Sequence, residues 1–527
     1  VTKDAGVPSA VLTVGGANAS NLAGTIATGC KVLFAPTVAK TLSMRDSFVL
    51  STGAEVELSN GGGAGAGALE TSLTADPTQG TLTVSAGALR VEYGYKGDRA
   101  AWGSGLTVNM GAGRTATFAL YESASSNIVN QINAKFAIAS TATFTASRPA
   151  DALQARVRLN NVELAGGGTL TAASPDDQII DVSIKMMGAT GTLTNSTGSD
   201  TEAYLRNLTK DPGVVGTAVL TAGGANGTRM VGSIAANCKV LCSLSAAANS
   251  RMGSGFSMDP TAEVEFATNS TGYMENGMTP TPSAGTLRVT TGNLSIYTGL
   301  TGLTWGSGLN IVLNTGRTVV GYVEERAALP RAENRIEASV VIGAGASNTL
   351  AGERNNDTTY EGIVHFHNVQ AAAGSIILPD SRNGTRVVVG DLTLTGDVSF
   401  TNNDDGSNIY IENVTGAYAF TVTGSQDTRI IGDINVNKFT TTRELRLAGL
   451  SVSDSPSVTV TTSVILGGGI TYEATNNPGA ASISGEVVLG ANRTFTIGDS
   501  STVDPELTMA GNVSGAYNLS KAGAGVM

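Results

Sequence analysis

Pairs of apolar residues, two positions apart, recur between residues 387 and 470 with only brief polar gaps between them. A spacing of two places both side chains on the same face of a β-strand. The gaps lack the regularly spaced Asn-Gly or Asp-Gly dipeptides that are typical of hairpins. The pairs are Val387 and Val389, Leu392 and Leu394, Val398 and Phe400, Ile409 and Ile411, Phe420 and Val422, Ile434 and Val436, Leu445 and Leu447, Leu450 and Val452, Val458 and Val460, and Val464 and Leu466. The pattern favours short parallel strands that meet at bends and stack coil upon coil, as in a β-solenoid.

The abundance of small residues supports the same fold class. The chain has 67 glycines among its 527 residues, and charged residues make up only 14% of it. Coils stacked at about 4.8 Å crowd the backbone at their corners, where Gly and Asn are favoured because they tolerate left-handed dihedral angles. We predict an all-β fold, a long parallel β-helix or solenoid with about 20 to 25 residues per coil. The alternative is a sandwich or a chain of immunoglobulin-like domains, which would also show alternating strands.

Long-range repetition divides the chain. Segments near the N-terminus return 207 to 208 residues later, and the offset drifts further along through small shifts at loops. The matched segments include Val11–Thr13 and Val219–Thr221, Cys30–Leu33 and Cys238–Leu241, Ala54–Glu57 and Ala262–Glu265, and Trp102–Leu106 and Trp305–Leu309. We predict solenoid repeat units at 1–208 and 209–385 and a C-terminal solenoid segment at 386–527. Duplication of a long unit is typical of a structural or adhesive rod, whereas an enzyme normally needs one site.

Charge and hydropathy limit the partners. Lys and Arg number 32 against 43 Asp and Glu, so the formal net charge is −11 and the pI is near 4.8. Without a basic stripe, binding to nucleic acid is not expected. No run of 18 or more apolar residues occurs, so no transmembrane helix is expected. The first residues lack the pattern of a signal peptide, which fits a mature or trimmed product.

Cysteine and tryptophan residues indicate packing. Cys30, Cys238 and Cys242 are too few for a disulfide scaffold and lack the spacing of a zinc site. On one strand face, Cys238 and Cys242 would lie about 13 Å apart, too far for a disulfide. We predict free, buried thiols. Trp102 and Trp305 precede Gly-Ser-Gly at matched places, which indicates repeated packing anchors more than a platform for sugars.

Two stretches of mixed charge, residues 121–135 and 322–337, interrupt the apolar alternation at matched places. Each is interpreted as a loop or short-helix excursion from the solenoid. Mixed-sign charge is typical of a solvated face. The alternative is a lateral contact between subunits, because excursions that repeat along a rod are suited to one.

The two histidines of the chain, His365 and His367, flank Phe366. A strand would point both imidazoles to one side, a spacing that is compatible with a shared metal ion. The sequence offers no third ligand nearby, so we favour an ordinary structural role for both residues.

An oxygen-rich segment, residues 402–408, precedes Glu412. Gly406 and Glu412 occupy positions 6 and 12 of an EF-hand-like spacing, but Thr401 stands at position 1. Asn403, Asp405 and Glu412 are therefore calcium candidates, and the alternative is a polar turn between two strands. Calcium is the one cofactor that the sequence suggests.

Enzymatic activity is not expected, and no catalytic or cofactor-binding residues are assigned. The chain lacks a nucleophile elbow with a distant His, a phosphate-binding loop followed by Lys and Ser or Thr, and an HExxH motif. A carbohydrate-active β-helix would need two or three carboxylates on adjacent coils. Glu163, Asp176, Glu361 and Asp433 are available, but nothing in the sequence brings them together.

The C-terminal residues resemble a known family. Leu519, Lys521, Gly523 and Gly525 match an apolar residue, one residue, Lys, and then Gly-x-Gly. Gly511–Gly525 is therefore similar to the opening of the autotransporter-associated β-strand repeat. The resemblance implies a right-handed β-helix passenger of a bacterial cell-surface protein, and it implies no catalytic residues.

Together these features predict a non-enzymatic, extracellular structural or adhesive solenoid of a bacterial cell surface. We expect it to self-associate into a filament or array, or to form part of a longer rod, because the end coils of a solenoid expose unpaired strand edges. Cell-surface or glycan partners are compatible with this hypothesis. The alternative is a carbohydrate-active or glycan-binding β-helix, such as a phage tailspike or fibre.

Overall fold

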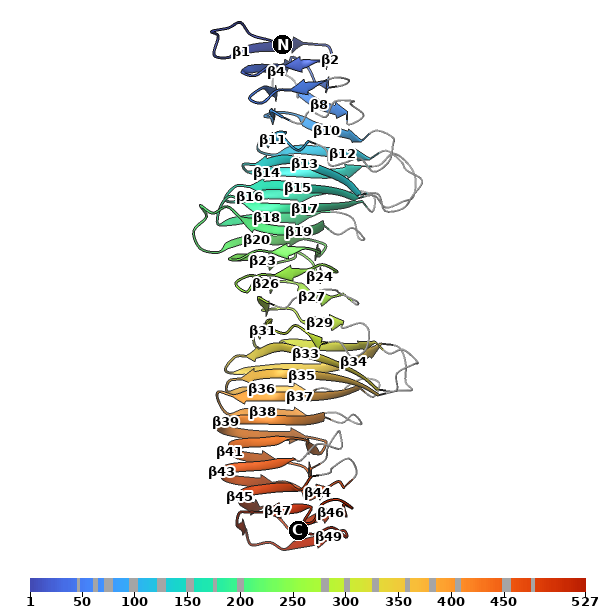
Figure 1. Ribbon diagram of the computed structural model, residues 1–527, viewed down its shortest axis with the longest axis vertical. Helices are drawn as coiled ribbons and strands as arrows, with labels where there is room; N and C mark the ends of the chain where they lie inside the picture. The colour runs from blue at the N-terminus through green and yellow to red at the C-terminus, as the bar shows by residue number, and fades with distance from the viewer. Residues whose placement is uncertain are drawn as a thin grey trace. The chain divides into compact units, whose positions relative to one another are not determined.

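A computed structural model describes the whole chain apart from residues 45–47, 60–64, 71–78, 94–102, 121–128, 148–155, 174–177, 197–202, 276–283, 298–303, 325–330, 356–360, 379–384, 403–408, 448–455 and 475–478. The described residues form strands β1 to β49 and contain no helix, which confirms the all-β prediction. Accordingly, no described helix has the length and apolar character needed to cross a membrane. The chain forms two compact units, Val1–Ser270 and Thr271–Met527, and the strands of each are stacked in parallel as a β-solenoid (Figure 1).

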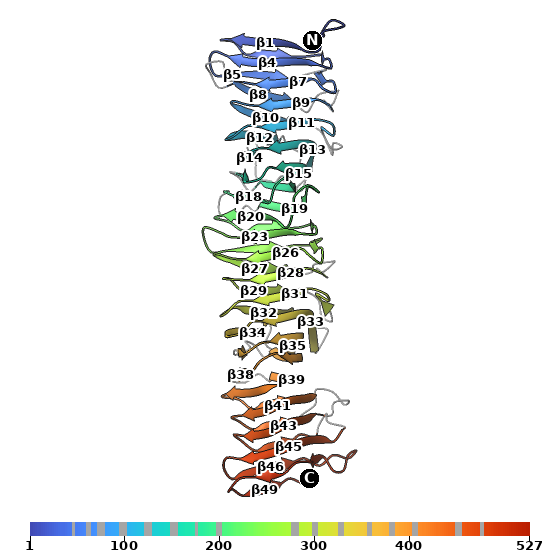
Figure 2. The same ribbon diagram turned by 90° about the vertical axis from the view of Figure 1, so that its left-hand side faces the viewer.

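The described strands of the first unit form three columns, which we call A, B and C. Figure 2 shows the first strands of column A, β1, β4, β7, β9 and β11, one after another in the stack. Column A consists of β1 (Ala10–Gly16), β4 (Cys30–Pro36), β7 (Glu55–Leu58), β9 (Thr81–Val84), β11 (Thr107–Met110), the second halves of β13 (Val129–Ile138), β15 (Arg156–Leu164), β17 (Ile179–Met186) and β19 (Ala203–Lys210), then β22 (Ser233–Ile234) and β25 (Ser257–Met258).

Columns B and C complete the coils of this unit. Column B consists of β2 (Ser20–Leu22), β5 (Lys40–Met44), β8 (Gly65–Glu70), β10 (Ala88–Tyr93), β12 (Arg114–Leu120), β14 (Thr141–Ser147), β16 (Gly168–Ala172), β18 (Thr190–Asn195), β20 (Ala218–Gly224), β23 (Cys238–Cys242) and β26 (Glu263–Phe266). Column C consists of β3 (Thr25–Ile26), β6 (Val49–Leu50), the first halves of β13, β15, β17 and β19, β21 (Thr228–Met230) and β24 (Ala248–Met252).

The second unit has columns D, E and F. Column D consists of β30 (Thr304–Trp305), the first parts of β33 (Arg331–Ile342), β35 (Glu361–Ala371), β37 (Thr385–Leu394) and β39 (Ile409–Gly424), then β40 (Thr428–Ile430), β42 (Leu445–Leu447), β44 (Ile470–Tyr472), β46 (Arg493–Ile497) and β49 (Leu519–Ala522). Column E consists of β28 (Thr286–Val289), β31 (Asn310–Leu313), the second parts of β33, β35 and β37, the middle of β39, the first parts of β41 (Asp433–Thr441), β43 (Ser457–Leu466) and β45 (Ala481–Leu489), and β47 (Leu507–Met509).

Column F holds the remaining strands of the second unit. It consists of β27 (Ser270–Met274), β29 (Leu294–Tyr297), β32 (Thr318–Glu324), β34 (Ala346–Asn355), β36 (Gly374–Leu378), β38 (Val398–Asn402), the last parts of β39, β41, β43 and β45, and β48 (Val513–Ser514).

Coil length varies along the chain. In the first unit Ala10 pairs with Cys30 of the next coil, whereas in the second unit Asn310 pairs with Ser339. The first of these coils lies within the predicted range of lengths, and the second is longer than predicted. Much of the difference lies in the strands, because β2 and β3 of the first coil have three and two residues, whereas β32 of the second coil has seven and continues into the twelve-residue β33.

Alternating side chains build the core. In β4 the burial alternates strictly, with the side chains of Cys30, Val32 and Phe34 at most 1% exposed. The predicted pairs between 387 and 470 are confirmed, because all of their described side chains are at most 7% exposed. Ile409 has no described side chain, and Leu450 and Val452 lie outside the described residues. Period-2 alternation therefore located the inner faces of the strands.

The repeated sequence does not return to the same column. Cys30 lies in β4 of column A, whereas its counterpart Cys238 lies in β23 of column B. Both side chains are inward and at most 1% exposed. The repeat offset is therefore not a whole number of coils, and a sequence motif that recurs is presented on a different column. The predicted unit boundaries at 208 and 385 stay predictions.

The mixed-charge stretches, expected as loop or short-helix excursions, are strands wherever they are described. Residues 129–135 belong to β13 and residues 331–337 belong to β33. In β33 the buried positions alternate with Arg335 and Glu337, so the charges cover the outer face of a strand. Residues 121–128 and 325–330 lie outside the described part of the chain.

Packing roles are confirmed for the described cysteines and tryptophan. All three thiols are free and buried. Burial raises the pKa of the Cys242 thiol to about 12, so this side chain stays a neutral thiol at neutral pH. Trp305 is only 2% exposed, whereas Trp102 lies outside the described residues.

Candidate functional site

The second unit brings both histidines and Glu412 together on its outer face. His365 and His367 flank the inward Phe366 in β35, which is fully buried, so both imidazoles lie on the opposite face of the strand. Their ring centroids are 5.5 Å apart and the rings meet edge to face. One ligand atom from each histidine and one carboxylate oxygen of Glu412 lie within 4.8 Å of one another. This is the third donor that the sequence did not reveal.

Strand register explains how Glu412 reaches the histidines from two coils away. Phe366 pairs with Val389 and then Ile411, which places His367, Gly390 and Glu412 in one row across β35, β37 and β39. A Cβ atom at Gly390 would lie 2.8 Å from His365 Nε2 and 2.7 Å from the His367 carbonyl oxygen. Because Gly390 has no side chain, the carboxylate of Glu412 can cross β37 to reach β35.

Charge holds the carboxylate of Glu412 in its ionised form. Its Oε2 lies 3.1 Å from His365 Nε2. This contact lowers the pKa of Glu412, against a smaller effect of burial, and the nearby His367 and Arg335 act in the same direction. His365 is 4% exposed, whereas the side chains of His367 and Glu412 are 27% and 34% exposed. The site is therefore buried at His365 and open to solvent at His367 and Glu412.

Arg335 and Glu337 of β33 border the site. Arg335 Nη2 lies 3.2 Å from His367 Nδ1, and Arg335 Nε lies 3.2 Å from Glu337 Oε1. Because a guanidinium only donates hydrogen bonds, His367 Nδ1 is the acceptor, so in the neutral ring the proton lies on Nε2. That nitrogen is 3.7 Å from Glu337 Oε2. The tautomer and the orientation of His367 are thus set by β33.

The predicted calcium loop is described only at Glu412. Asn403 and Asp405 lie outside the described residues, so the oxygen-rich site stays a prediction. Glu412 itself lies in β39 against His365. Its surroundings in the described part of the chain are therefore two imidazoles, and not a set of oxygen ligands.

Sequence reasoning noticed His365, His367 and Glu412 separately and missed Arg335, Glu337 and Gly390. The lengths of two coils, from β35 to β37 and from β37 to β39, bring these residues into line, because they set the register between the strands. Coil lengths vary along the chain, so this alignment needed the observed register.

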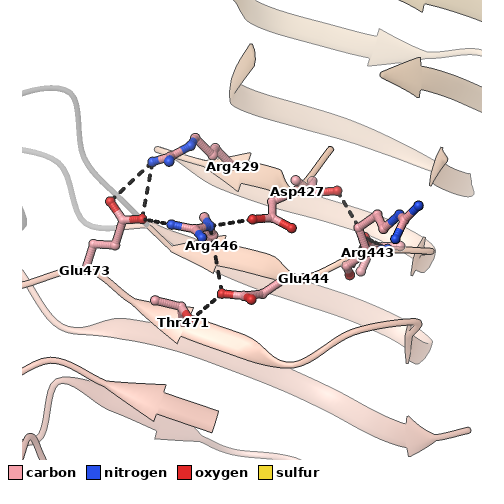
Figure 3. A network of polar contacts seen from close by, with 9 residues as sticks. Asp427, Arg429, Arg443, Glu444, Arg446, Thr471 and Glu473 are labelled. Atoms are coloured by element: carbon pink, nitrogen blue, oxygen red, sulfur yellow. Dashed lines mark hydrogen bonds and ion pairs between the residues drawn. The ribbon is translucent and has the colours of Figure 1, made fainter. Parts of the chain in front are cut away.

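In a second cluster of charges, on β40, β42 and β44 and the residues beside them, arginines and carboxylates pair with one another (Figure 3). Arg446 donates to Asp427 over 2.7 Å and to Glu473 over 2.8 Å. Arg429 donates to both carboxylate oxygens of Glu473 at 3.3 and 3.2 Å. Glu444, 3.8 Å from Arg446, also accepts a hydrogen bond from Thr471. The cations and carboxylates satisfy one another across coils, which is the arrangement of a structural ladder.

In the first unit, Asp181 of β17 is fully buried and serves two arginines. Arg158 Nε lies 3.1 Å and Arg206 Nη2 lies 2.9 Å from Asp181 Oδ2. Arg206 Nε adds contacts of 3.2 Å to both carboxylate oxygens. The three side chains come from successive coils, β15, β17 and β19, so this cluster also ties the stack together.

Tyr273, Tyr297 and Tyr322 stack along column F. Their ring centroids are 4.5 and 4.0 Å apart, and the second pair is parallel within 5°. Burial is the main cause that raises the pKa of Tyr297, to about 12. The faces of the central ring are covered by its neighbours, so the stack is suited to holding coils together and not to stacking on a sugar.

The carboxylates suggested for a carbohydrate-active site do not form a described cluster. Glu163 lies 3.4 Å from Lys135. Asp433 accepts a hydrogen bond from Ser457. Asp176 and the side chain of Glu361 lie outside what the structure describes. No pair from this set is brought together among the described side chains.

Comparison of the chain with family models, with curated proteins and with solved structures gives no match. The resemblance of Gly511–Gly525 to the autotransporter-associated repeat therefore stays a prediction.

Proposed function

We propose that the protein is a non-enzymatic structural or adhesive β-solenoid on the outside of a bacterial cell, where it self-associates or forms part of a longer rod. The observation that carries the proposal is the parallel stack itself, whose terminal strands keep an open edge. Among the described residues, β1 pairs with β4 and β49 pairs with β46, and neither has a second strand partner. An open edge can accept a further parallel strand through backbone hydrogen bonds.

Side chains at these terminal coils support the same proposal. Leu12 faces inward in register with the buried Val32, yet it is 45% exposed. At the other end, Val513 is 41% exposed and Tyr517 is 50% exposed. A further coil, from the same protein or from another copy, would cover this apolar surface and pair the strand edge at the same time.

The polar clusters favour a structural role over catalysis. The networks around Arg446 and Asp181 connect consecutive coils, and their charges are paired within the stack. Location on a bacterial surface rests on the C-terminal resemblance, in which Lys521 and the Gly-x-Gly that follows match the autotransporter-associated pattern. Glycan-binding and phage-fibre functions are the alternatives that the test below addresses.

Negative-stain electron microscopy of the purified chain, over a range of concentrations and with or without calcium, tests the proposal. We expect end-to-end filaments or arrays that become more frequent with concentration. Leu12→Lys should reduce them, because a charge would be buried in the joined core. Val215→Lys is the matched control, since Val215 is 92% exposed in the turn between β19 and β20.

Particles that stay separate at every concentration would contradict self-association by this chain. A glycan array and an assay for trimer formation would then test the alternatives. Equal assembly of wild type, Leu12→Lys and Val215→Lys would show that the contact lies elsewhere than at the β1 edge.

A further inference from the structure

We infer that His365, His367 and Glu412 bind one divalent transition metal ion, of the Zn²⁺ class, that joins β35 to β39 across β37. The inference starts from the convergence of the donors. The only two histidines of the chain and one carboxylate meet with their ligand atoms within 4.8 Å. Coil stacking alone does not bring these donors together, because both histidines lie in β35 and Glu412 lies in β39, with β37 between them.

The chemistry of the donors selects the metal class. Two imidazole nitrogens and one carboxylate oxygen suit Zn²⁺, Ni²⁺, Cu²⁺ or Fe²⁺, whereas Ca²⁺ and Mg²⁺ prefer oxygen ligands alone. Zn–N distances of about 2.0–2.1 Å put neighbouring ligands of a tetrahedral ion about 3.4 Å apart. The contact of 3.1 Å between His365 Nε2 and Glu412 Oε2 already has that spacing. The donor atom of His367 lies within 4.8 Å of the other two.

The surroundings favour a cation and give it a path from solvent. Glu412 and Glu337 bring two negative charges to the row, and Arg335 brings one positive charge. His367 and Glu412 are partly exposed, so an ion can enter from the outer face. Glu337 Oε2 lies 3.7 Å from His367 Nε2, so its negative charge lies beside a nitrogen that could ligate the ion.

Gly390 provides the space that the inference needs. Any larger residue at this position would place a Cβ 2.8 Å from His365 Nε2. An ion held between β35 and β39 would thus lie over β37 at Gly390, the one position of the row without a side chain. Bound metal would tie three coils together and stabilise the folded chain by linkage.

Calorimetric titration of the tag-free full-length chain with Zn²⁺, after removal of metals with a chelator, tests the inference. We expect one ion per chain and a higher thermal midpoint in its presence, with no comparable effect of Ca²⁺. His367→Gln and Glu412→Gln should each weaken binding by about tenfold to 100-fold or more, since even partners of ligands contribute that much. Glu486→Gln is the control, because Glu486 is an exposed carboxylate of the same unit that only accepts from Ser514.

Spectroscopy of the wild-type protein provides a second test, which does not depend on the variants. Because the chain has only His365 and His367, Cu²⁺ or Co²⁺ bound to imidazole nitrogen in the wild-type protein must use them. Electron paramagnetic resonance of the Cu²⁺ complex should show coupling to two nitrogens. The inference is overturned if no ion binds, if the signal shows oxygen ligands alone, if Ca²⁺ binds equally well, or if all variants bind like Glu486→Gln.

Discussion

Single buried charges connect the coils of this solenoid, and Asp181 is the clearest case. Its carboxylate is fully buried and is shared by Arg158 and Arg206. Asp181→Asn keeps the shape but removes the charge that both arginines face. We expect a loss of about 3 kcal/mol in the free energy of unfolding, the lower end of the range for breaking a buried pair, because both arginines are partly exposed. Urea unfolding at pH 7 measures it.

Glu163→Gln is the control for this prediction. Glu163 pairs with Lys135 at 3.4 Å, and the two side chains are 19% and 37% exposed. Loss of such a pair should change stability by less than about 1 kcal/mol. Equal effects of the two substitutions would mean that the burial of Asp181 adds nothing to its role.

We expect the Glu57 carboxylate to account for part of the stability that the first unit loses in acid. A hydrogen bond from Lys31 over 2.5 Å is the main cause that lowers the pKa of Glu57 below 4.5, and Ser85 adds a second one over 2.7 Å. A lowered folded-state pKa gives stability that is present above pH 4.5 and is lost as the pH falls through the folded value. We therefore expect Glu57→Gln to lower the thermal midpoint at pH 7, and the gap from wild type to close in acid.

Thermal scans from pH 7 down to pH 2.5 in both proteins provide the measurement. Lys31 gives the opposite sign at high pH: its pKa is raised above 10.5, so its contribution disappears as the pH rises through the folded value. A gap between Glu57→Gln and wild type that is constant across the acid range would contradict the assignment.

At the scale of strands and corners, glycines allow successive coils to touch through their backbones. Gly227, between β20 and β21, would place a Cβ only 1.7 Å from the Asn249 carbonyl oxygen of the next coil. Gly227→Ala must therefore push this corner away from β24, and we expect a loss of about 1–3 kcal/mol or more, as for an overpacked core. Gly490→Ala is the control, because a Cβ at that position would have no other atom within 4 Å.

Denaturant midpoints at constant pH compare the two glycine variants. Gly490 also has no left-handed dihedral angle, so alanine there should be neutral or slightly stabilising. If Gly227→Ala were as stable as Gly490→Ala, the close approach of this corner to β24 would have no energetic weight.

The same scale shows what the sequence could predict. Strand faces followed from alternation, because most inward side chains are apolar in every column. The charges of β33 were misread as an excursion because Arg335 and Glu337 also alternate, with Ile336 and Ala338 buried between them. The row of His367, Gly390 and Glu412 was out of reach, since it depends on the lengths of two coils, and coil length varies along the chain.

At the scale of the whole molecule, we expect groups of neighbouring coils to differ in stability and to unfold separately. Most described interior strands pair with the coil before and the coil after them, and the chain forms two compact units, Val1–Ser270 and Thr271–Met527. In such stacks the free energy is a sum over coils and their nearest-neighbour contacts, so one damaged coil weakens its surroundings first. A single transition for the full chain is therefore not expected.

Hydrogen exchange of wild type and Gly227→Ala, followed by mass spectrometry, tests this division. We expect faster exchange in β20, β21, β23 and β24, which pair with or flank the altered corner, and unchanged exchange in β41, β43 and β45 of the second unit. The reason is that each coil contacts only its neighbours, so weaker strand pairing at one corner can affect a distant coil only by way of all the coils between them. Uniform acceleration across both units would instead mean that the 527 residues open as one cooperative structure.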